Sequence, residues 1–91
     1  MNLPELRTQI DAIDRELIGL LEKRMDIAAD IASYKRENGL PVLDAEREAE
    51  KLAAVSARCR AETAPHIAGI FRAIMAASRD LQAALTEGRH G

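Results

Sequence analysis

The sequence predicts an all-α protein with three helices in each chain, the first of them very long. Ala, Leu, Ile, Glu and Arg dominate the composition, and aromatic residues make up only 2% of it, which is typical of helical proteins. Apolar residues recur at alternating steps of three and four, the spacing of one face of a helix. Helix-breaking signals are few, and they divide the chain into one long segment and two shorter ones.

The first helix is expected to begin near Pro4, which suits an early helical position, and to end at Asn38-Gly39, where Pro41 reinforces the stop. A single cation, Arg24, interrupts the apolar stripe of this helix. The stripe comprises Leu3, Leu6, Ile10, Ile13, Leu17, Leu20, Ile27, Ile31 and Tyr34.

Asp44 is a good N-cap for a second helix, which we expect to reach about Arg60. Thr63 and Pro65 mark the start of a third helix that ends near Gly88, after which residues 88–91 are expected to fray. Each of these helices also has one polar interruption. Glu48 stands among Ala45, Leu52, Val55 and Cys59, and Ser78 stands among Ile67, Phe71, Ile74, Leu81 and Leu85. Burying an unpartnered polar group is costly, so three interrupted stripes indicate a polar site on the inward faces.

Length and composition predict one domain, residues 1–91, and exclude several classes of function. With 13 basic and 15 acidic residues the formal charge is −2, which gives no general attraction to nucleic acid or to an anionic membrane. We find neither a signal-peptide pattern nor a long apolar run, and expect a cytoplasmic protein. The only cysteine, Cys59, fits a reducing compartment and is read as a small core residue. His66 and His90 lie far apart without other ligands nearby, so no metal is expected.

The length of the first helix predicts a dimer. A helix over residues 4–38 is about 50 Å long, whereas a compact domain of this size is only about 30 Å across. The helix would protrude beyond its own core with an apolar stripe still uncovered. A second chain must cover the stripe, most simply in an intertwined antiparallel homodimer.

Several polar residues share helix faces and form a candidate binding site. Arg24 and Lys35, eleven residues apart, lie on one face of the first helix, with backbones about 16 Å apart. Arg7 lies about 25 Å from Arg24 along the same axis, but an antiparallel dimer would bring it to the Arg24 of the other chain. The remaining candidates are Asp44, Arg47 and Glu48 on one turn of the second helix and Ser78 and Gln82 on the third. This set suits a small, multiply anionic ligand that carries a hydroxyl group.

An alternative interpretation is purely structural, with Arg24 and Glu48 as a buried ion pair and Ser78 as a small packing residue. The sequence contains no Ser-His-Asp order, phosphate-binding glycine-rich loop or acid pair suited to glycoside chemistry. An enzyme with these residues would work by positioning and electrostatics.

At these residues the sequence resembles the small all-helical chorismate mutases, from Leu6 to about Leu85. The likeness is carried by an ordered set of motifs: Leu6-Arg7 with Ile10, Ile13-Asp14 and Leu17; the run Leu20-Leu21-Glu22-Lys23-Arg24; Lys35; the segment Pro41-Val42-Leu43-Asp44-Ala45-Glu46-Arg47-Glu48; and Phe71 with Ser78 and Gln82. Relative to the family, we expect a short connection over residues 58–64 and no appended domain.

The resemblance implies that the substrate is chorismate, which a Claisen rearrangement converts to prephenate without nucleophile, metal or cofactor. It also implies the following roles. Arg7 of the second subunit and Arg24 hold the carboxylates, Ser78 and Arg47 assist, Lys35 and Gln82 donate to the ether oxygen, and Glu48 accepts from the ring hydroxyl, with Asp44 nearby.

Two rival functions remain open at the level of sequence. An isochorismate-pyruvate lyase has a similar fold, but Glu48 favours a mutase because we expect the lyases to lack that carboxylate. A non-catalytic helical dimer would explain the stripes and the long helix. It would not explain why Lys35, Glu48, Ser78 and Gln82 occur together.

Overall fold

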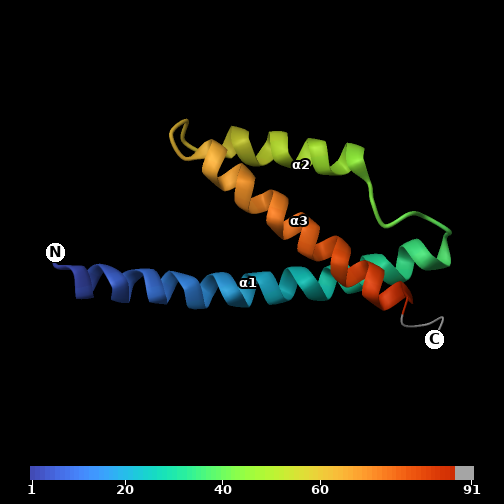
Figure 1. Cartoon of the computed structure of the whole chain (residues 1–91), viewed down its shortest axis with the longest axis horizontal. Coiled ribbons are helices and arrows are strands. Elements are labelled where there is room, and N and C mark those ends of the chain that lie inside the picture. The colour runs from blue at the N-terminus through green and yellow to red at the C-terminus, as the bar shows by residue number, and fades with distance from the viewer. Residues whose placement is uncertain (88–91) are drawn as a thin grey trace.

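The computed structural model describes residues 1–87 and contains three helices, α1 (Leu3–Glu37), α2 (Ala45–Arg58) and α3 (Ala64–Glu87) (Figure 1). The all-α class and the long first helix are therefore confirmed. The second helix stops two residues before the expected Arg60, at a C-cap formed by Cys59 in extended conformation. Gly88, near which the third helix was expected to end, and the tail 88–91 lie outside the described residues. None of the described helices is long and apolar enough to cross a membrane.

Side-chain and backbone caps define both ends of α1. Asn2 and Glu5 form a reciprocal capping box, and the helix begins at Leu3, one residue before the predicted start near Pro4. At its end, Leu40 N donates to Lys35 O at 2.7 Å and Gly39 adopts a φ of +65°. This is the Schellman arrangement, in which glycine tolerates the left-handed conformation, and it confirms the stop predicted at Asn38-Gly39.

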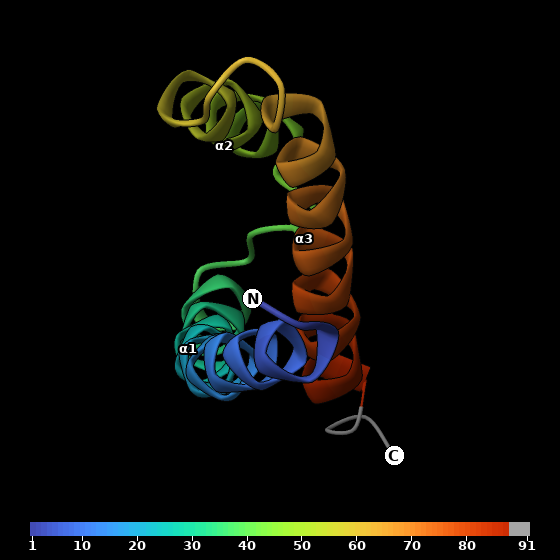
Figure 2. The same ribbon diagram turned by 90° about the vertical axis from the view of Figure 1, so that its left-hand side faces the viewer.

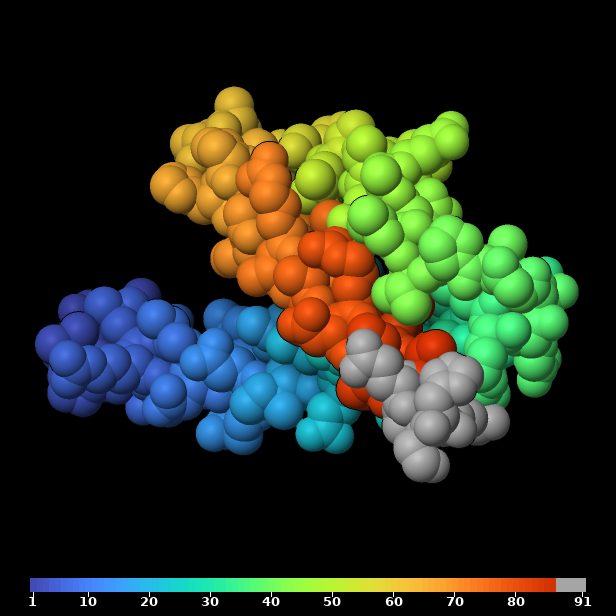
Figure 3. All heavy atoms as spheres, turned by 45° about the vertical axis from the view of Figure 1, so that its right-hand side comes forward, coloured from blue at the N-terminus to red at the C-terminus, as the bar shows by residue number. Residues whose placement is uncertain are grey.

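The third helix lies between the other two. It packs against both α1 and α2, whereas the backbones of α1 and α2 do not come close to each other in the described part of the chain (Figure 2). The molecule is consequently extended, measuring 54 × 27 × 15 Å, and the N-terminal part of α1 projects beyond the other two helices (Figure 3). This shape agrees with the protrusion that the helix length predicted.

The apolar stripe of α1 is left largely exposed by its own chain. Every apolar member of the stripe, from Leu3 to Tyr34, is between 40% and 62% exposed, including those on the half of α1 that α3 covers. Helix α3 instead meets α1 at Ala28 and Ala32, which are buried. These alanines lie about 100° around the helix from Ile27 and Ile31, and their small side chains allow close helix approach. Ile27 and Ile31 line a cavity between the helices, and the stripe is otherwise left exposed within a single chain.

The buried line of α3 is also displaced from the predicted one. Ala68, Met75, Ser78 and Gln82 are its buried residues. The predicted apolar members are half-buried or, at Leu85, exposed, because α3 has a different helix on each flank. Polar residues thus occupy the most enclosed part of α3, which is where the candidate site begins.

Candidate functional site

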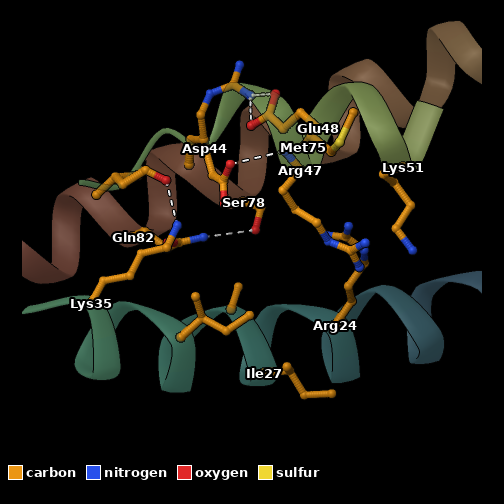
Figure 4. Close-up of a pocket in the computed structure, with 14 residues that line it drawn as sticks. Arg24, Ile27, Lys35, Asp44, Arg47, Glu48, Lys51, Met75, Ser78 and Gln82 are labelled. Atoms are coloured by element: carbon orange, nitrogen blue, oxygen red, sulfur yellow. Dashed lines mark hydrogen bonds and ion pairs between the residues drawn. The ribbon is translucent and has the colours of Figure 1, made fainter. Parts of the chain in front are cut away.

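A cavity of about 380 Å³ lies among the three helices, within the range of about 300–1,000 Å³ typical of small-molecule sites (Figure 4). Apolar residues and charged or polar residues share its lining. The lining comprises Arg24, Ile27, Ala28, Ile31 and Lys35 of α1, Val42 of the connecting loop, Asp44, the N-cap of α2, Arg47, Glu48 and Lys51 of α2, and Met75, Ser78, Arg79 and Gln82 of α3.

The structure brings together seven of the eight candidate residues from the sequence. The seven are Arg24, Lys35, Asp44, Arg47, Glu48, Ser78 and Gln82. The polar interruptions of the three stripes, Arg24, Glu48 and Ser78, therefore share one cavity. Arg7 does not line it, because it lies on the projecting part of α1.

Lys35 is held in place by the chain that follows α1. Its ammonium group donates to the backbone carbonyl oxygen of Val42 at 2.6 Å, and the side chain is half-buried. An ammonium group has three donors, so others remain for a ligand in the cavity.

Gln82 and Ser78 form a buried polar pair on successive turns of α3. Gln82 Nε2 donates to Ser78 Oγ at 3.4 Å, a long contact, while Gln82 Oε1 is buried and has no hydrogen-bond partner in the described structure. A half-turn of the amide would let Oε1 accept from the Ser78 hydroxyl and would free Nε2 to donate to a ligand. A buried unpartnered group costs roughly 1–3 kcal/mol, and a bound ligand would relieve that cost.

Both carboxylates of the cavity already have partners. Asp44 accepts from the backbone N–H of Arg47 at 3.0 Å, which confirms it as the N-cap of α2. Glu48 accepts at both carboxylate oxygens from Nη1 of Arg79 on α3. The alternative interpretation of Arg24 and Glu48 as an ion pair is therefore wrong: Arg79 is the partner of Glu48.

The lining carries an excess of positive charge. Five cationic side chains face two carboxylates, a formal balance of +3. Arg24, Arg47 and Lys51 have no carboxylate partner among the described side chains, and all three point into the same end of the cavity (Figure 4). Such an arrangement attracts a small ligand with more than one negative charge.

Sequence reasoning missed two cations of the lining, Lys51 and Arg79. Lys51 follows Arg47 at i+4 on the same face of α2, so helical spacing alone could have included it. Arg79 follows Ser78 directly and lies about 100° from it around the axis of α3. The sequence pattern therefore places Arg79 on the solvent-exposed face, and only the position of α2 shows that it faces the cavity. Cys59, half-buried at the end of α2, does not line the cavity.

Comparison with protein families gives one match, which covers most of the chain. The family described as chorismate mutase type II matches residues 6–83. This range contains all eight candidate residues from the sequence as well as Lys51 and Arg79.

Individual relatives match over about half of the chain. The chain is 42% identical over 52 residues to the T-protein of Haemophilus influenzae, which covers 57% of this chain and 14% of that protein. It is 41% identical over 46 residues to a chorismate mutase of Methanocaldococcus jannaschii, covering 50% of this chain and 46% of that one. A 3-dehydroquinate dehydratase of Pyrobaculum aerophilum is 42% identical over 50 residues, 55% of this chain and 17% of that protein. The chain thus spans less than half the length of each, and no solved structure matches it significantly.

Proposed function

Because the chain belongs to the chorismate mutase type II family, we propose that it catalyses the rearrangement of chorismate to prephenate. In this Claisen rearrangement the C–O bond of the enolpyruvyl ether breaks as a C–C bond forms across the ring, so no atom is gained or lost. The reaction requires a flexible dianion to be held in its reactive conformer and negative charge on the ether oxygen to be stabilised.

One observation carries the proposal: three helices each contribute a different functional group to one cavity. These groups are the ammonium of Lys35 on α1, the carboxylate of Glu48 on α2 and the amide of Gln82 on α3. A structural ion pair would account for Glu48 alone. It would not account for a buried amide with an unpartnered oxygen beside a cation.

Lys35 and Gln82 are the proposed donors to the ether oxygen. Lys35 is fixed by its bond to Val42 O, and Gln82 is almost fully buried, so both side chains are held at the cavity before the substrate arrives. The half-turn of the Gln82 amide described above makes its Nε2 available to the substrate. A fixed donor gains strength as negative charge develops on the oxygen, which favours the transition state over the bound substrate.

The cationic end of the cavity is the proposed carboxylate site. Arg24 and Arg47 hold the substrate carboxylates, with the Ser78 hydroxyl assisting. Glu48 accepts a hydrogen bond from the ring hydroxyl. Asp44 acts through the backbone: by capping α2 it fixes the turn that carries Arg47 and Glu48.

The complete site requires a second chain. On the projecting half of α1 the exposed stripe, from Leu3 to Leu20, offers an apolar surface, and soluble proteins rarely leave such a surface uncovered. An antiparallel homodimer about this surface would carry Arg7 of the partner subunit to the end of the cavity near Arg24. Arg7 would then complete the carboxylate site.

Product analysis tests the proposal. The purified protein is incubated with chorismate and, separately, with isochorismate; prephenate from chorismate is the expected product. Arg24→Ala should be nearly inactive, whereas Arg15→Ala, which removes an exposed cation from the same helix, should keep the parent activity. Salicylate and pyruvate from isochorismate as the main products would identify a lyase instead, and no turnover of either compound would favour a binding module.

A further inference from the structure

The side chain of Arg79 makes the only ion pair between two different helices in the described part of the chain. Its Nη1 atom donates to both oxygens of Glu48, and thereby links α3 to α2 inside the cavity lining. The pair is partly enclosed, with 33% of the Arg79 side chain and 25% of the Glu48 side chain exposed. Arg79 follows Ser78 in the sequence, so the ion pair lies beside the Ser78 hydroxyl and the Gln82 amide on the same helix.

Without Arg79, the Glu48 carboxylate could form an ion pair with another cation of the cavity. Lys51 lies one turn further along α2 at i+3, within reach of a glutamate side chain, and Arg24 faces α2 from α1 (Figure 4). A carboxylate that turned toward these groups would neutralise cations needed for an anionic substrate. The Arg79 contact keeps the negative charge separate from the cationic end of the cavity.

The contact also leaves Glu48 able to bind a hydroxyl group. A carboxylate offers about four lone-pair sites, and one donor shared between its two oxygens uses no more than one on each. The remaining sites can accept a hydrogen bond from the substrate while Arg79 stays in place. Arg79 therefore need not be displaced when the substrate binds.

We propose that Arg79 is a positioning residue, which acts through Glu48 by fixing the direction of its carboxylate and keeping it away from the anion-binding cations. The inference rests on the proposed mutase function, because it assigns Glu48 to the substrate hydroxyl. It adds a residue that the sequence pattern did not include. Arg79 itself makes no contact with the reacting atoms in this proposal.

A double-mutant cycle in the full chain tests this inference with chorismate as the substrate. Arg79→Met should lower kcat/KM by roughly tenfold to a hundredfold, the range for hydrogen bonds to a charged group. Arg79→Lys should lose less activity than Arg79→Met, because lysine keeps the positive charge although it lacks the planar guanidinium group. In a Glu48→Gln background, Arg79→Met should change kcat/KM by less than about threefold, since the group that it positions is gone. Arg72→Met, an exposed arginine two turns earlier on α3, is the matched control and should resemble the parent.

The outcomes separate this inference from the proposed function. A parent protein that does not convert chorismate removes the proposed function, and the inference with it. An active parent with Arg79→Met equal to Arg72→Met overturns the inference alone. So does a full additional loss in the Glu48→Gln background, or a gain in kcat/KM, which would mean that Arg79 competes with the substrate. Arg79→Gln, which keeps a donor without the charge, replaces Arg79→Met in the same cycle if circular dichroism shows that the methionine variant is not folded.

Discussion

The ammonium group of Lys35 donates to the carbonyl oxygen of Val42 at 2.6 Å, across the turn that connects α1 to α2. This bond joins a helix residue of the cavity to the loop immediately before the N-cap of α2. It limits the rotation of a long and otherwise flexible side chain. The ammonium group is thus directed into the cavity before any ligand binds, as the proposed electrostatic role requires.

Replacement of Lys35 should affect the chemical step. Removal of one preorganised donor at a developing oxyanion typically lowers kcat by about a hundredfold to a thousandfold, and Lys35→Ala should lose at least that much. The measurement is kcat and KM from steady-state conversion of chorismate, with folding checked by circular dichroism. Lys23→Ala, which removes an exposed lysine from the same helix, is the control. A rise in KM with kcat unchanged would show that Lys35 only holds the substrate.

Gln82→Glu should make activity depend on pH. The parent amide donates at any ordinary pH, whereas a carboxyl group donates only when protonated and, once ionised, opposes the negative charge on the ether oxygen. The activity of the variant should therefore be highest at acidic pH and fall as the pH rises through the pKa of the new carboxyl. Profiles of kcat/KM against pH for the two proteins test this. Parallel profiles would remove Gln82 from the proposed catalytic set.

Lys51 should contribute to substrate affinity rather than to the chemical step. It faces the cationic end of the cavity, one turn beyond Arg47, and is half-buried. Lys51→Met should raise KM by about twofold to fivefold with little change in kcat, because a partly exposed charge contact is worth up to about 1 kcal/mol. Arg58→Met, at the exposed end of the same helix, is the control. An unchanged KM at low ionic strength would exclude Lys51 from the carboxylate site.

Shared sites in the proposed dimer should permit complementation between inactive variants. Arg7→Ala and Arg24→Ala should each be nearly inactive. After subunit exchange, a heterodimer of the two contains one site with both arginines intact, so activity should return. A mixture of Arg24→Ala and Lys35→Ala is the matched control: both residues line the cavity of their own chain, so neither site is repaired. If exchange is demonstrated by mass spectrometry and the first mixture stays inactive, Arg7 does not act on the partner's site.

Local chemistry made most of the fold predictable from the sequence. Alternating steps of three and four located the helices, and the Asn38-Gly39 stop and the Asp44 cap are formed by the residues that were expected to form them. The polar interruptions at Arg24, Glu48 and Ser78 located the cavity, because burying a polar group is costly and such groups therefore indicate a site.

The remaining features depend on how the helices cross, which periodicity does not determine. Ile74 and Met75 both belong to an apolar face, and only the packing of α3 between two helices selects Met75 as the buried one. The partner of Glu48 is decided in the same way. Arg24 and Arg79 carry equal charges, but the crossing of α2 and α3 brings Arg79 to the carboxylate.

In the described part of the chain α3 alone packs against both α1 and α2, and this has a consequence for the order of assembly on the ribosome. The chain is synthesised from α1 onward, and neither of the first two helices offers the other a packing surface. The cavity therefore cannot close until the last third of the chain has emerged, when Met75 and Gln82 insert between the two walls. A nascent chain that ends before α3 holds the cationic residues of the cavity without the helix that encloses them, and it should be susceptible to proteolysis until synthesis is complete.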